Sequence, residues 1–158
     1  MKSATVFACI LAPFISLAQS NSGTIALSDS ITLSWTIKVF IQKEHQISYC
    51  NDGYQKYLCK IDNKEWFGDE RSEALPVNQL VKLALKIGNR SYNLLTTKMF
   101  NPNFSGQLYK HQFNIKKYDK YYMLYSFFSD GAGTYIARWK IFNDRAVRVL
   151  ISNKEEDF

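Results

Sequence analysis

The residues best placed to do chemistry are two cysteines, Cys50 and Cys59, which flank an Asn-Asp-Gly turn signal. A zinc site takes about four ligands, and only His45 and His111 are available as histidine ligands to join the cysteines. A redox pair typically has Cys-x-x-Cys spacing, which this pair lacks. A disulfide is the other bonded state, and it forms in oxidising compartments outside the cytoplasm. The state of the pair therefore depends on where the chain is sent.

The N-terminus has the pattern of a secretory signal peptide. A lysine at position 2 precedes a mostly apolar run over residues 4–17, and residues 16–18 read Ser-Leu-Ala, with small residues where a signal peptidase reads. The run is shorter than the about 20 residues that cross a bilayer, and Pro13 interrupts it, which argues against a membrane anchor. We predict a signal peptide over residues 1–18 and a periplasmic or secreted mature chain, residues 19–158, that forms a single β-rich domain.

Export favours a disulfide between Cys50 and Cys59, because an even pair of cysteines in an oxidising compartment is most often bonded. A tight hairpin turn at residues 51–53 would place the two cysteines about 17 Å apart along a strand. A disulfide allows only about 7 Å between α-carbons. We therefore expect residues 51–58 to form a wider loop, and we expect neither a metal nor a cofactor.

Alternation of apolar and polar residues predicts strands through most of the remaining chain. Residues 81–87 read Val-Lys-Leu-Ala-Leu-Lys-Ile, with the valine, leucines and isoleucine on one face and the lysines on the other. Gly88-Asn89 then fits a two-residue type II′ turn, because its first position favours the positive φ of glycine. Such a turn would set Leu85 opposite Tyr92.

The same pattern recurs along the chain, with turn signals between its segments. The further segments are residues 31–41, 109–115, 121–128, 135–142 and 146–152. This spacing predicts an all-β fold, a single-domain antiparallel β-sandwich or partly open barrel of about nine or ten short strands. At most one short helical segment is expected, at residues 76–80.

Positive charge is concentrated in the middle of the chain. Between Lys82 and Lys120 there are eight basic residues and one acidic residue, whereas the chain after residue 18 has 19 basic and 14 acidic residues in all. A basic patch attracts anionic partners. Nucleic acid suits basic and aromatic residues, but an exported chain meets little of it. An acidic protein, a lipid head group or an anionic polymer fits better, and dispersed surface lysine is the alternative.

Two segments carry more large apolar residues than one core face needs. The strands expected at 121–128 and 135–142 are apolar on both faces, so they are either covered twice, which is the more frequent arrangement, or leave an aromatic face exposed for a partner. The loop at residues 98–107 contains Met99, Phe100 and Phe104, which either pack onto the core, the more frequent arrangement, or contact a partner as a plug.

The sequence contains no catalytic motif that would mark the chain as an enzyme. Gly-x-Ser-x-Gly and His-Glu-x-x-His are absent. His111 shares a predicted strand face with Tyr109 and Phe113, so we expect a core or edge residue, and His45 lies near a strand start. We assign no catalytic residue.

In its size, signal, single disulfide, β pattern and aromatic content, the chain resembles small exported β-proteins that bind and neutralise another protein, such as the periplasmic immunity proteins and lysozyme inhibitors of bacteria. The resemblance is one of class and implies a binding protein that occludes a toxin or cell-wall hydrolase. Because lysozymes are generally basic, a neutral or acidic enzyme suits this chain better. An envelope-maintenance or adhesion domain that binds anionic lipid or polysaccharide is the alternative, and a small hydrolase ranks third. The residues predicted to contact the partner are Lys82, Lys86, Arg90, Lys98, Phe100, Phe104, Lys116, Lys117, Tyr122, Arg138 and Lys140.

Overall fold

The computed structural model describes residues 20–68, 72–128 and 133–158, so the predicted signal peptide and most of the loop at 129–134 lie outside the described residues. Within these ranges the fold is all-β, as predicted, with eleven strands in three antiparallel sheets. Helical structure there is limited to three 3₁₀ turns, and none is long or apolar enough to cross a membrane. No helical turn forms at residues 76–80, because strand β6 already begins at Asn78.

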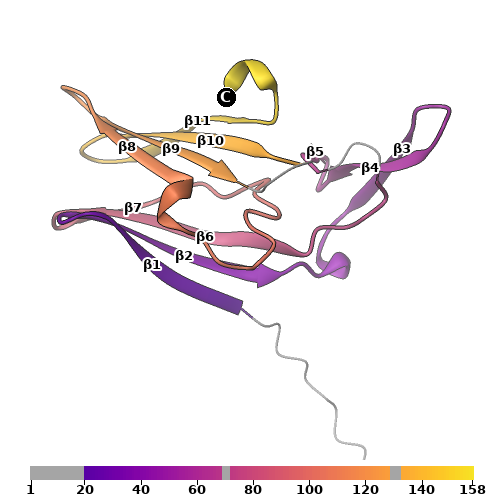
Figure 1. Cartoon of the computed structure of the whole chain (residues 1–158), viewed down its shortest axis with the longest axis horizontal. Helices are drawn as coiled ribbons and strands as arrows, with labels where there is room; N and C mark the ends of the chain where they lie inside the picture. Colours follow the sequence, from indigo (N-terminus) through magenta and orange to yellow (C-terminus); the bar gives the residue numbers. More distant parts are fainter. Residues whose placement is uncertain (1–19, 69–71, 129–132) are drawn as a thin grey trace, which may run out of the picture.

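Two four-stranded sheets face each other as a sandwich (Figure 1). The first has the order β1 (Ser20–Ser28), β2 (Ile31–Val39), β6 (Asn78–Ile87), β7 (Arg90–Asn93). The second has the order β11 (Ala146–Ser152), β10 (Tyr135–Ile141), β9 (Tyr122–Phe128), β8 (Phe113–Lys117). Every second side chain points between the sheets, and Leu33, Leu85, Leu124 and Trp139 are completely buried there.

The hairpin of β6 and β7 confirms the predicted register. Leu85 pairs with Tyr92, and the N–H of Leu94 donates to the carbonyl of Leu83 at 2.8 Å. Gly88 has a φ of 57°, as the first position of a type II′ turn requires.

A β-bulge corrects the predicted faces at the start of β6. The pairing of β2 with β6 skips one residue, because Thr36 pairs with Lys82 and Ile37 pairs with Leu80. Val81 is the extra residue and is 39% exposed, whereas Leu80 is 3% exposed. The alternation from Val81 to Ile87 had placed Val81 inside, and the bulge gives that position to Leu80.

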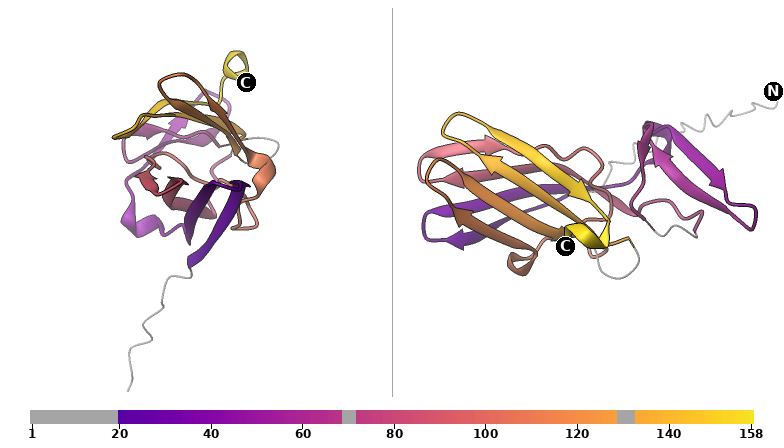
Figure 2. Two further views of the ribbon diagram at one scale, coloured as in Figure 1. Left: turned by 90° about the vertical axis from the view of Figure 1, so that its left-hand side faces the viewer. Right: turned by 90° about the horizontal axis from the view of Figure 1, so that it is seen from above.

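A small third sheet lies at one end of the sandwich and consists of β3 (Ile47–Asn51), β4 (Lys56–Ile61) and β5 (Lys64–Glu65) (Figure 2). The predicted disulfide joins Cys50 to Cys59, with their α-carbons 5.7 Å apart.

The expected wide loop over residues 51–58 is wrong, because the disulfide bridges a β-hairpin whose second strand begins at Lys56. The turn occupies residues 52–55, so Cys50 pairs with Tyr57 rather than with a residue next to the Asn-Asp-Gly signal. A bulge opposite Ser48 and Tyr49 leaves Cys59 as the extra residue of β4. Cys59 therefore lies diagonally across from Cys50, within bonding reach.

The loop at residues 98–107 holds the small sheet against the sandwich. Met99 joins the main core, as expected, and Phe100 joins a second cluster with Phe40, Leu58 and Ile61. Phe104 differs from the expectation, because its side chain is 49% exposed.

Candidate functional site

The outer surface of the second sheet combines exposed aromatic rings with cations, and we call it the aromatic face. Alternation in β9 sends Leu124 and Phe128 into the core and leaves Tyr125 and Phe127 outside. The first sheet covers only the inner side of these strands. The sequence favoured cover on both sides, and this expectation is wrong. The aromatic face consists of Lys116, Tyr118, Tyr121, Tyr125, Phe127, Arg138, Lys140 and Phe142.

Contacts between rings and cations organise this surface. The Tyr118 and Tyr121 rings stack with centroids 4.9 Å apart, and Lys140 Nζ lies 4.3 Å from the centroid of Tyr121. The guanidinium carbon of Arg138 lies 5.7 Å from the ring centroid of Tyr125. The hydroxyl oxygens of Tyr118 and Tyr125 lie 3.3 Å apart and share a hydrogen bond. This hydrogen bond, together with partial burial, raises the pKa of Tyr125. The rings are therefore held in place and carry positive charge directly above them.

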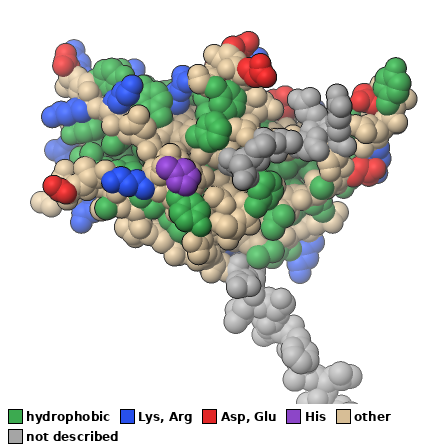
Figure 3. Space-filling model, in the orientation of Figure 1, with side chains coloured by type: hydrophobic (Ala, Val, Ile, Leu, Met, Phe, Trp, Pro, Cys, Tyr) green, Lys and Arg blue, Asp and Glu red, His purple; other side chains and the backbone are tan. Residues whose placement is uncertain are grey.

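Charge sign is segregated between strands and turns. The strands β8 to β11 contain five basic residues, Lys116, Lys117, Arg138, Lys140 and Arg148, and no acidic residue. The four strands of the first sheet contain Lys38, Lys82, Lys86 and Arg90 and likewise no acidic residue. The acidic side chains in view in Figure 3 accordingly gather at the ends and top of the molecule, while Lys, Arg and hydrophobic side chains lie along the sheets. The strands of both sheets therefore present positive charge.

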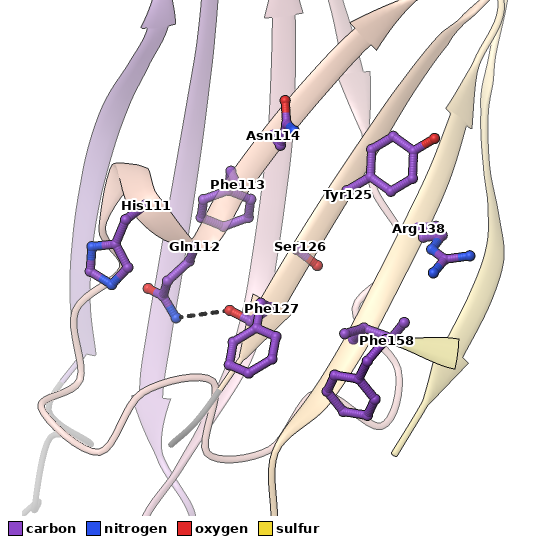
Figure 4. Close-up of a pocket in the computed structure, with 10 residues that line it drawn as sticks. His111, Gln112, Phe113, Asn114, Tyr125, Ser126, Phe127, Arg138 and Phe158 are labelled. Atoms are coloured by element: carbon purple, nitrogen blue, oxygen red, sulfur yellow. Dashed lines mark hydrogen bonds between the residues drawn. The ribbon is translucent and has the colours of Figure 1, made fainter. Parts of the chain in front are cut away.

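A groove of about 310 Å³ is cut into the aromatic face (Figure 4). Phe127, Ile136 and Phe158 give it apolar walls, and Arg138 and His111 contribute polar groups. Gln112 is buried and donates from Nε2 to the carbonyl of Phe127 at 3.4 Å and to that of Pro102 at 3.0 Å. These bonds tie the rim of the groove to β9. The groove suits one large apolar side chain with an acceptor beside it.

The structure divides the eleven predicted partner residues between separate surfaces. Lys116, Arg138 and Lys140 lie together on the aromatic face. Lys117 lies 6.0 Å from the ring centroid of Tyr122, which packs against the core and therefore belongs to the inner side of the sheet.

The basic pair on the first sheet faces the other way. Lys82 and Lys86 are exposed on β6, whose inward residues Leu83 and Leu85 are buried between the sheets. They therefore lie on the surface opposite to the aromatic face. Arg90 turns toward the second sheet, where its Nη1 donates to the carbonyl of Asn143 at 3.3 Å.

The predicted residues of the 98–107 loop are separated as well. Lys98 Nζ lies 4.0 Å from the ring centroid of Phe67 and 4.0 Å from a carboxylate oxygen of Glu65, and burial lowers its pKa. Phe100 is buried in the second cluster. Phe104 is exposed and lines a different groove, beside Val39 and Asn78.

Sequence reasoning did not select the five rings of the aromatic face, Tyr118, Tyr121, Tyr125, Phe127 and Phe142. Their shared side was visible, because alternation puts Tyr121, Tyr125 and Phe127 on one face of the predicted strand. The sequence contains no signal that tells which face of this strand the first sheet covers.

His45 forms the only described contact between a histidine and a carboxylate, with Nδ1 2.8 Å from Oδ2 of Asp62. Partial burial alone would raise the pKa of Asp62, but hydrogen bonds from His45 and from the N–H of Gln46 lower it below its ordinary value. A histidine so oriented by a carboxylate would act as a base through Nε2. That atom is buried without a hydrogen-bond partner among the described residues, and the ring stacks on Phe40 at 4.7 Å. The pair therefore links elements of the small sheet.

His111 is exposed, which corrects the expectation of a core or edge residue. The segment at 110–112 is a 3₁₀ turn, so the strand predicted to start at Tyr109 begins only at Phe113. The His111 ring stacks on Tyr109 with centroids 5.7 Å apart and stands at the rim of the groove.

Within the part of the chain that the structure describes, no three His, Cys, Asp or Glu side chains cluster closely enough to hold a metal ion. Comparisons with protein-family models, with curated proteins and with solved structures find no match for the chain.

Proposed function

We propose that this chain is an exported binding protein whose aromatic face docks on, and occludes, an anionic partner protein, such as a neutral or acidic toxin or cell-wall hydrolase. The observation that carries the proposal is an exposed sheet face that unites a groove, aromatic rings and cations on strands without acidic residues. Tyr and Arg are the side chains that most often anchor protein interfaces.

The shape of the face favours a protein over a polymer. A groove of about 310 Å³ accepts a single anchoring side chain. A repeating polymer would instead bind along an elongated groove that contacts several repeats. The side chain of Phe127 is 47% exposed, so its ring is available to contact the anchoring side chain.

Anionic lipid or polysaccharide is the second candidate, and the first sheet supports it. Lys82 and Lys86 carry positive charge on the opposite surface, so a flexible anionic polymer would meet cations on both sides of the sandwich. This attraction is electrostatic, and salt would screen it about equally on the two surfaces.

Charge reversal on either surface separates the candidates. We expect Lys116→Glu/Lys140→Glu to weaken capture of an envelope protein by about tenfold or more, because reversing a contacting charge adds repulsion. The matched control, Lys82→Glu/Lys86→Glu, reverses the same number of charges on the opposite surface and should retain the partner.

Quantitative pulldown from envelope extract, with sedimentation against anionic liposomes and cell-wall material at low and high salt, measures both candidates. Recovery of no protein, or an equal loss in the two variants, would contradict the docking proposal. Salt-sensitive sedimentation that both variants lose would instead support the polymer.

A further inference from the structure

The chain's own C-terminal segment, residues 153–158, turns back over the second sheet (Figure 1), and its Phe158 lies at the groove of the aromatic face (Figure 4). Phe158 lines the groove and meets Phe127 edge to face, with ring centroids 5.7 Å apart. Arg138 donates from Nη2 to the main-chain carbonyl of Asp157. One wall of the groove is therefore an aromatic ring of the chain's own C-terminal segment, with a main-chain oxygen acceptor on Arg138 beside it.

The composition of the segment matches the charge of the sheet below. It reads Asn-Lys-Glu-Glu-Asp-Phe, so three acidic residues directly precede the phenylalanine. The four strands beneath it contain basic residues and no acidic ones. An acidic segment with an aromatic residue thus complements the face in charge as well as in shape.

The segment is loosely seated. Phe158 is 51% exposed and its partner Phe127 is 47% exposed. The one ion pair described for the segment is internal, between Lys154 and Glu156 at 3.9 Å. Glu155 and Glu156 are exposed in a 3₁₀ turn. A ligand with more contacts would therefore replace the segment at small cost.

We propose that residues 153–158 are an internal stand-in for the ligand of this groove. The ligand is an acidic segment of the partner protein that carries an aromatic side chain; it inserts the ring beside Phe127, places an oxygen on Arg138 and displaces Phe158. This inference rests on the proposed function and names the segment of the partner that binds in the groove.

The probe that tests it is a synthetic Asn-Lys-Glu-Glu-Asp-Phe peptide with both ends blocked, titrated into the full chain and followed by amide resonances of β9 and β10. Phe158→Ala opens the groove, and we expect saturable shifts in this variant. The wild type should need about tenfold more peptide, because a tethered segment competes at an effective concentration in about the millimolar range.

Three controls show whether the peptide binds in the groove. Adding Arg138→Gln to Phe158→Ala should weaken binding about threefold or more, while adding Lys86→Gln, on the opposite surface, should leave it unchanged. A peptide with alanine in place of its phenylalanine should not bind the opened variant. Preserved dispersion of the amide spectrum establishes that each variant is folded.

The inference is overturned if the opened variant shows no saturable shifts, if the wild type binds equally well, or if Arg138→Gln has no effect. This failure is distinguishable from failure of the proposed function. If Lys116→Glu/Lys140→Glu still abolishes capture of an envelope protein, docking stands and only the assigned ligand class falls.

Discussion

The sandwich and the small sheet are built from the same alternating strands but are held together differently. In the sandwich, both sheets contribute to one continuous cluster that includes Trp35, Phe128, Tyr135 and Trp139. The buried cluster under the small sheet is much smaller, and two of its members, Phe40 and Phe100, come from outside the sheet. A sheet with so little apolar surface to bury needs other ties.

Those ties are covalent and polar. The disulfide crosses the β3–β4 hairpin. Asp62, with a φ of 54°, occupies the turn between β4 and β5 and accepts hydrogen bonds from His45 and from the N–H of Gln46. Hydrophobic burial therefore stabilises the sandwich, whereas the position of the small sheet depends on the disulfide and on these hydrogen bonds.

The largest effect is expected from the sandwich core. Trp139 is completely buried, so Trp139→Ala should lower the free energy of unfolding by about 3–5 kcal/mol, the usual cost of truncating a buried aromatic side chain. Urea denaturation measures this loss. The control Phe104→Ala removes an exposed ring and should change stability by about 0.5 kcal/mol or less. A loss under about 1 kcal/mol at Trp139 would show that the cluster is not the main source of stability.

Removing the disulfide should have a smaller and more local effect. Cys50→Ala/Cys59→Ala releases a short loop, for which the chain-entropy model gives about 2–3 kcal/mol. Hydrogen exchange would report it: protection of the Leu58 amide, which donates to the carbonyl of Ser72, should fall, while the amides of β6 keep theirs. Equal loss of protection in both regions would mean that the small sheet and the sandwich unfold as one unit.

The smallest effect concerns Asp62 and depends on pH. A carboxyl whose pKa is lowered by folding stabilises the fold above its unfolded pKa of about 3.9, and the contribution disappears as pH falls through the lower folded value. Asp62→Asn should therefore cost about 0.5 kcal/mol at pH 7, the range for a partly exposed pair, and progressively less as the pH falls below the unfolded pKa.

Thermal or urea midpoints at pH 7 and pH 3 measure this difference. Asp29→Asn, in the exposed turn between β1 and β2, is the control and should be neutral at both values. A cost at Asp62 that persists unchanged at pH 3 would rule out the ionised carboxylate as its source.

Much of the fold was predictable because its signals are local. Alternation identified most strands of the sandwich but neither β1 nor the small sheet, and Gly88 at a position of positive φ set the register of β6 and β7. The four bulges in the described strand pairs were not predictable, although each inserts one residue and changes which side chains face inward. At Val81 the bulge reversed a burial prediction, and at Cys59 it reconciled a hairpin with a disulfide.

The candidate site was predictable to a lesser degree. Of the predicted partner residues, Lys116, Arg138 and Lys140 meet on the aromatic face, while Lys82 and Lys86 occupy the opposite surface. Nearness along the chain suggested one basic patch. The sandwich separates it, because the β6–β7 hairpin lies in the first sheet and the β8–β9 hairpin lies in the second.

By itself, the order of residues determined which side chains stand together on a strand, since successive positions must point to opposite sides. It could not determine which of the two apolar sides of residues 121–128 would be buried. Burial depends on how the first sheet, formed by β1, β2 and β6 with β7, packs against these residues. Only packing of the first sheet against Leu124 and Phe128 left Tyr125 and Phe127 facing outward, and with them the groove.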